Sequence, residues 1–111
     1  MSELATVTAT DLGGARLLSI RGEVDLSNVS TVMAAISASI PSDASTIIVD
    51  LSETAYLDST GLAMLFRFAR RLDYSRQEFR LVVPPESPLR RVLELTNASR
   101  VIPIEDELPR P

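Results

Sequence analysis

The amino-acid sequence predicts a single α/β domain in which a mixed, mostly parallel sheet of four or five strands packs with helices. Segments with the apolar spacing of helices alternate with short β-branched or apolar runs, in the order β-β-α-β-α-β-α-β. Right-handed crossovers through the helices make most neighbouring strands parallel. The length of 111 residues suits one compact domain, and we expect its ordered core to span about residues 4–105.

The first part of the chain predicts a hairpin followed by a helix. Residues 6–12 are rich in β-branched side chains, and Gly13-Gly14 supplies a turn. Residues 15–21 alternate well enough to form a second strand, which we expect to be antiparallel to the first. Apolar residues then recur at helical spacing until Pro41 ends this first helix.

The middle of the chain predicts a central strand and the longest helix. Residues 46–51 resemble a strand, and within them Ile47-Ile48-Val49 is a continuous apolar run, which is typical of a strand covered on both faces. A short turn leads into an amphipathic segment, 60–74, in which the arginines lie largely on the solvated side. The stripe that we expect to be buried consists of Leu62, Leu65, Phe66, Ala69 and Leu72. Met64 and Phe68 flank it, as the edge of the core or as partner contacts.

The last part of the chain predicts a strand, a short helix and a final strand. Residues 78–83 form the first of these elements, and Ser87 caps a helix that begins with Pro88. Residues 101–104 are expected to form the final short strand. The acidic, proline-containing tail, 105–111, is expected to fray.

Composition excludes several classes of function. The chain has no cysteine, no histidine and no lysine, which removes thiolate chemistry, imidazole bases and lysine Schiff bases. We therefore expect no enzyme activity, no cofactor and no metal. The net charge of −4 argues against a nucleic-acid partner, and no apolar run approaches the ~18 residues that span a membrane. A cytoplasmic protein is the simplest interpretation.

The stretch Asp58-Ser59-Thr60-Gly61 opens the long helix and is the leading candidate site. A hydroxyl in the first turn of a helix is surrounded by unpaired backbone N–H groups and by the positive end of the helix dipole, so it can carry a phosphate. The same pattern is also what an ordinary helix cap looks like. Gly61 is unusual there, because glycine costs about 1 kcal/mol in a helix relative to alanine. Its benefit is close approach, either by the neighbouring chain or by a docked partner.

Acidic residues surround this candidate site. The turns 23–25 and 53–59 follow strands, and ligand and partner sites on such sheets lie beyond the carboxyl ends of the strands. Asp25 and Asp58 could in principle bind a metal together. An aspartic-protease site is excluded, because that chemistry needs two aspartates that share a proton and a different spacing to glycine.

The order of these motifs resembles that of a known family. The sequence Gly22-Glu23-Val24-Asp25 is followed by a helix, an apolar strand and, about thirty-three residues on, Leu57-Asp58-Ser59-Thr60-Gly61-Leu62. This combination is similar to the anti-sigma factor antagonist family, whose domain is called STAS, after sulfate transporters and anti-sigma antagonists. The resemblance covers about residues 4–105. The chain departs from it by ending soon after the last strand, where family members often have a further helix.

The resemblance implies a binding module in a partner-switching system that regulates transcription, as in stress responses. It implies that Ser59 is phosphorylated by an anti-sigma factor that is itself a serine kinase, and that a phosphatase restores Ser59. The unphosphorylated form would capture the kinase and free the sigma factor, with ATP and magnesium belonging to the kinase. The docking surface implied comprises Glu23, Asp25, Asp58, Thr60, Gly61 and Leu62. The alternative is a STAS subunit of a membrane transport complex, in which this surface docks constitutively.

Overall fold

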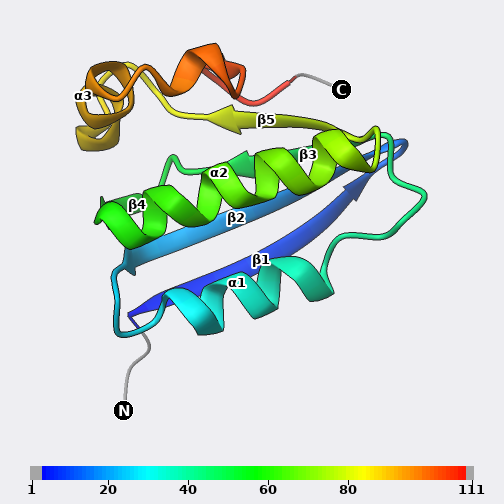
Figure 1. Ribbon diagram of the computed structural model, residues 1–111, viewed down its shortest axis with the longest axis horizontal. Helices are drawn as coiled ribbons and strands as arrows, with labels where there is room; N and C mark the ends of the chain where they lie inside the picture. Colours follow the sequence, from blue (N-terminus) through cyan, green and yellow to red (C-terminus); the bar gives the residue numbers. More distant parts are fainter. Residues whose placement is uncertain (1–3, 110–111) are drawn as a thin grey trace.

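The computed structural model describes residues 4–109, which form a six-stranded mixed sheet and three α-helices (Figure 1). The strands run in the order β1-β2-β3-β5-β6, and β4 pairs with β2 outside this path. The elements are β1 (Ala5–Leu12), β2 (Ala15–Val24), α1 (Val29–Ala38), β3 (Thr46–Asp50), β4 (Thr54–Leu57), α2 (Ser59–Tyr74), β5 (Glu78–Val82), α3 (Pro88–Leu95), the 3-10 helix η1 (Ala98–Arg100) and β6 (Ile104–Glu105). The predicted fold class is confirmed, although the sheet has six strands within residues 4–109 and not the expected four or five.

The strand β2 organises the sheet because it pairs with three other strands. It is antiparallel to β1 through the hairpin at Gly13, whose φ of +75° glycine adopts without strain. On its other side, the first half of β2 pairs in parallel with β3, and its carboxyl end pairs in parallel with β4. The strands β3 and β4 thus lie along the same side of β2, one after the other, with a turn between them. Because α2 follows β4 directly, the helix begins near the carboxyl end of β2.

Alternate residues of the strands face a core on one side of the sheet. Ile47 and Val49 of β3 belong to this core, whereas Ile48 points to the other side. Both α1 and α2 cover the core face (Figure 1), and α3 packs beside β4. Within residues 4–109, none of the helices is long and apolar enough to cross a bilayer.

The long helix α2 buries a different stripe from the predicted one. Met64 and Phe68, expected at the edge, are 0% and 3% exposed, whereas Leu62 and Phe66 are only partly buried at the margin of the core. The buried positions follow the helical period but are rotated by about one residue. The period of a helix fixes the width of its apolar stripe, and the packing against the sheet decides which part of that stripe lies deepest.

The carboxyl-terminal region also departs from expectation. The strand predicted at 101–104 is replaced by η1 and by the shorter β6, which pairs in parallel with β5. The tail was expected to fray, but Arg80 contacts Glu105 at 3.3 Å and Arg90 contacts Asp106 at 3.0 Å. These ion pairs join the start of the tail to β5 and to α3, and residues 110–111 lie outside the described range.

Candidate functional site

The predicted site lies where the carboxyl ends of β2 and β4 meet. Val24 and Leu57 are partners in the parallel register, and the Asp58 backbone N–H donates to the Val24 carbonyl at 3.2 Å. The two acidic turns that the sequence singled out therefore converge, although they are far apart along the chain. This arrangement depends on β4, which the sequence did not predict.

Asp58 joins the start of α2 to the loop after β2. Its Oδ1 accepts hydrogen bonds from the Thr60 N–H at 2.9 Å, the Thr60 hydroxyl at 2.6 Å and the Gly61 N–H at 3.0 Å. Its Oδ2 accepts from the Leu26 N–H at 3.1 Å. The Thr60 hydroxyl and then the Gly61 N–H lower the pKa of Asp58, while partial desolvation opposes them. Asp58 is therefore a negatively charged helix cap at neutral pH.

Ser59 is exposed and occupies the first position of α2. The neighbouring Thr60 hydroxyl is only partly exposed and is engaged with Asp58. One expectation needs correction, because the N–H groups of Thr60 and Gly61 are not unpaired: both donate to the Asp58 carboxylate. A phosphate on Ser59 would therefore share this helix end with a carboxylate that already occupies its donors.

The loop after β2 is held by its own polar side chains. Asp25 Oδ1 accepts from the backbone N–H and the hydroxyl of Ser27, at 2.8 and 2.5 Å. The Asn28 side chain accepts from the Asp25 N–H at 2.9 Å and donates to the Glu23 carbonyl at 2.8 Å. The Asp25 carboxylate thus stabilises the loop whose Leu26 N–H donates to Asp58. Glu23 is exposed on the approach to this loop.

Gly61 is buried, and its close approach is to neighbouring side chains of the same chain. A Cβ at this position would lie 2.6 Å from Leu57 Cδ1 and 3.3 Å from Val24 Cγ1. Glycine therefore lets the first turn of α2 pack tightly on the ends of β2 and β4. Leu62 is partly buried against the core, and its N–H donates to the Asp58 carbonyl at 3.0 Å.

Two further charged residues, Glu53 and Arg71, lie outside the site around Asp58 and Ser59. Glu53 pairs with Arg21, with Arg21 Nε donating to Glu53 Oε2 at 2.7 Å, so it adds little net charge to the site. Arg71 of α2 donates to the Ser37 hydroxyl at 3.0 Å and lies over the ring of Phe68. Its contacts are therefore with α1 and with its own helix. Among residues 4–109, no group of three or more Asp or Glu side chains is arranged to hold a metal ion.

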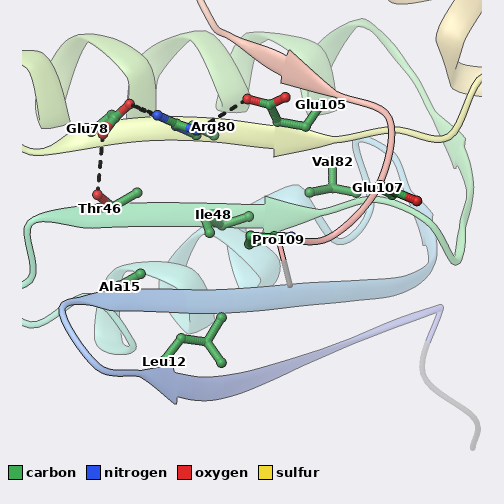
Figure 2. A pocket seen from close by; sticks show the side chains of 10 residues that line it. All are labelled: Leu12, Ala15, Thr46, Ile48, Glu78, Arg80, Val82, Glu105, Glu107 and Pro109. Carbon is green, nitrogen blue, oxygen red and sulfur yellow. Dashed lines mark hydrogen bonds and ion pairs between the residues drawn. The ribbon is translucent and has the colours of Figure 1, made fainter. Parts of the chain in front are cut away.

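A hollow of about 670 Å³ lies away from these residues, on the sheet face opposite α1 and α2. Figure 2 shows the hollow over the strands of the sheet, mainly β3 and β5, with the carboxyl-terminal tail crossing in front of β3 and Pro109 drawn next to Ile48. Arg80 at its rim donates to Glu78 and Glu105, and these two carboxylates raise the pKa of Arg80. The hollow is lined by Leu12, Ala15, Thr46, Ile48, Glu78, Arg80, Val82, Glu105, Glu107 and Pro109.

One residue of the candidate site, Leu26, was not predicted from the sequence. Leu26 is 75% exposed, although it is a large aliphatic side chain beside Asp58. In the sequence, Leu26 is an apolar residue between the polar Asp25 and Ser27, and it does not fit the apolar spacing of a helix or of a strand. An apolar residue outside any core pattern is the one sequence signal that could have pointed to Leu26.

This chain is similar to proteins of known family and known structure. A family model described as the STAS domain matches residues 6–109. The anti-sigma-F factor antagonist RsfB of Mycobacterium tuberculosis is 33% identical over 70 residues, which cover 63% of this chain. The match spans 57% of the length of RsfB.

Solved structures share the fold. An anti-sigma factor antagonist from Mycobacterium paratuberculosis has a TM-score of 0.83 at 26% identity, covering 94% of this chain and 87% of that one. The unphosphorylated form of the anti-sigma factor antagonist SpoIIAA has a TM-score of 0.71 at 21% identity, covering 92% and 90%. The phosphorylated form of Bacillus SpoIIAA has a TM-score of 0.67 at 22% identity, covering 92% and 93%.

Proposed function

The chain belongs to the STAS domain family, and we propose that it acts as an anti-sigma factor antagonist controlled by phosphorylation of Ser59. The observation that carries this proposal is the exposed Ser59 hydroxyl beside the ionised carboxylate of Asp58 at the start of α2. In this proposal the unphosphorylated chain binds an anti-sigma factor kinase in the cytoplasm and thereby frees a sigma factor. A phosphatase then reverses the modification.

We choose Ser59 over the neighbouring Thr60 and Ser52 because the hydroxyls of those two residues are already hydrogen-bonded within the chain. The Thr60 hydroxyl donates to Asp58 and the Ser52 hydroxyl donates to Asp50, so each is already engaged within the chain. The exposed Ser59 is accessible to the active site of a kinase. Serine can be modified here without unfolding the domain, because Asp58 caps the helix in either state.

Charge gives the switch a physical basis. Phosphorylation adds about −1.5 to −2 charges at Ser59. Glu23, Asp25 and Asp58 already make this edge of the sheet acidic. Because Asp58 occupies the N–H groups of Thr60 and Gly61, the helix end offers little compensation for the added charge. A partner that docks over this edge and excludes water would therefore lose affinity, by roughly a hundredfold for a 3 kcal/mol penalty.

The test is to purify the anti-sigma factor kinases of the source genome and measure their binding to this chain. Incubation of the cognate kinase with ATP should add one phosphate, located on Ser59 by mass spectrometry. Ser59→Ala should bind constitutively, and Ser59→Asp should bind at least about tenfold more weakly. Ser59→Asn is the matched control, because it has the shape of Asp without the charge, and it should bind like the alanine variant.

Three outcomes would contradict the proposal. Phosphate on Thr60 or Ser52 would refute the assignment of Ser59. Equal affinities of Ser59→Asp and Ser59→Asn would refute control by charge. Binding to the cytoplasmic part of a membrane transporter, with no kinase bound, would favour constitutive docking instead.

A further inference from the structure

Leu26 is an exposed apolar side chain within an acidic, well-ordered edge of the sheet. It is 75% exposed, so water covers most of a large aliphatic group. Burying such a group against a partner is favourable in proportion to the apolar area removed from water. Exposed apolar residues are common on proteins, so exposure alone does not assign a role. The contacts of the surrounding loop distinguish this one.

The loop that presents Leu26 is fixed on both sides. The residues before Leu26 are tied to those after it, because the Asp25 carboxylate accepts from Ser27 and the Asn28 side chain bridges the Asp25 N–H and the Glu23 carbonyl. The Leu26 N–H itself donates to Asp58 Oδ2 at 3.1 Å. The backbone at Leu26 is therefore ordered before any partner arrives. A preordered contact residue loses less conformational entropy on binding, so more of its burial energy becomes affinity.

The same hydrogen bond links Leu26 to the proposed switch. Oδ2 of Asp58 accepts from the Leu26 N–H, and Oδ1 accepts from the first turn of α2. That turn begins at Ser59. A partner large enough to place a kinase active site at Ser59 would therefore also cover Leu26. We propose that Leu26 is the apolar anchor of this docking surface, inserting into an apolar pocket of the kinase that is rimmed by arginine or lysine. This inference rests on the proposed function.

The chemistry of the pocket follows from the neighbours of Leu26. Glu23 and Asp25 precede Leu26 in the chain, and the Asp58 carboxylate accepts from its backbone N–H, so a complementary partner presents basic side chains around an apolar centre. The acidic residues would then govern the salt dependence and rate of association, and Leu26 would govern how long the complex lasts. These two contributions are separable by experiment.

The test uses the full-length chain and the purified kinase that binds it in the panel described above. Leu26→Ala should weaken binding at least about tenfold, equivalent to about 1.4 kcal/mol, mainly through faster dissociation and equally at low and high salt. Leu26→Met should restore most of the affinity. The control is Leu12→Ala, the same change at a 45% exposed position at the opposite end of the sheet, which should bind like the original chain. The thermal midpoints of Leu26→Ala and the original chain should agree.

Each other outcome would overturn the inference. An affinity of Leu26→Ala within about twofold of the original chain, with Ser59→Asp still weakened, would exclude the anchor and leave the proposed function standing. A lowered thermal midpoint for Leu26→Ala, or equal weakening by Leu12→Ala, would show a structural effect. Failure of the original chain to bind any kinase would overturn both the inference and the proposed function.

Discussion

Asp58 and Leu26 are 32 residues apart in the chain and are joined by a hydrogen bond of 3.1 Å from the Leu26 N–H to Asp58 Oδ2. The other oxygen of Asp58 caps α2. One carboxylate thus fixes the position of the loop after β2 relative to the first turn of the helix. The acidic residue of the motif is therefore a structural link as well as a source of charge.

Asp58→Asn is expected to preserve the fold while removing a pH-dependent part of its stability. Asparagine remains a good helix cap, but it lacks the charge that the donors around Asp58 stabilise. The pKa of Asp58 is lowered in the folded chain, so its contribution is fully present above the pKa of the unfolded chain. It is lost as pH falls through the lowered pKa. Urea unfolding at a series of pH values from neutral to strongly acid measures this effect.

The original chain should be more stable than Asp58→Asn at neutral pH, and the difference should shrink toward zero in strong acid. Asp43→Asn is the control, because Asp43 is exposed in the loop before β3. A difference between the original chain and Asp58→Asn that stays constant at every pH would contradict this assignment.

Gly61→Ala is expected to destabilise the domain by about 1 kcal/mol, despite the higher helix propensity of alanine. The added methyl would lie 2.6 Å from Leu57 Cδ1 within the core, and overpacking of this kind costs about 1–3 kcal/mol against a propensity gain of about 1 kcal/mol. Chemical denaturation measures the net change. Ala63→Gly, at an exposed position of α2, calibrates the propensity term. An increase in stability for Gly61→Ala would show that Leu57 and its neighbours shift at little cost to accept the added methyl group.

Arg90→Ala is expected to release the carboxyl-terminal tail while leaving most of the fold intact. Arg90 contacts Asp106 at 3.0 Å and donates to the Val83 carbonyl at 2.5 Å, and these bonds are worth about 1 kcal/mol together once solvent screening is considered. Hydrogen exchange of the backbone amides in the tail should accelerate. The matched control is Arg91→Ala, on the exposed side of the same helix. Unchanged exchange in Arg90→Ala would mean that Arg80 alone retains the tail.

The sequence predicted the main strands and helices of this domain better than the long-range strand pairing that connects them. The central strand, the long helix and the cap at Ser87 each have a local pattern that appears within a few residues. The strand β4 has no such pattern: it is four residues long and exists because its backbone pairs with the carboxyl end of β2. Its contacts are long-range, so no window of sequence reveals them.

The same distinction applies to the candidate site. The exposure of Ser59 and the capping role of Asp58 follow from the start of a helix, which local sequence specifies. The hydrogen bond to Leu26 and the fit of Gly61 against Leu57 depend on where β2 and β4 end in space. The sequence could therefore name the residues of the site, but it could not say which of them hold it together.

Leu4, the residue before β1, offers a way to observe docking directly. The Glu23 N–H donates to the Leu4 carbonyl at 2.9 Å, so position 4 lies beside the loop that carries Leu26. The Leu4 side chain is 46% exposed, and the chain contains no cysteine. A Leu4→Cys variant would thus accept a single thiol-reactive fluorophore at the rim of the proposed interface, whose emission would follow kinase arrival and departure in real time.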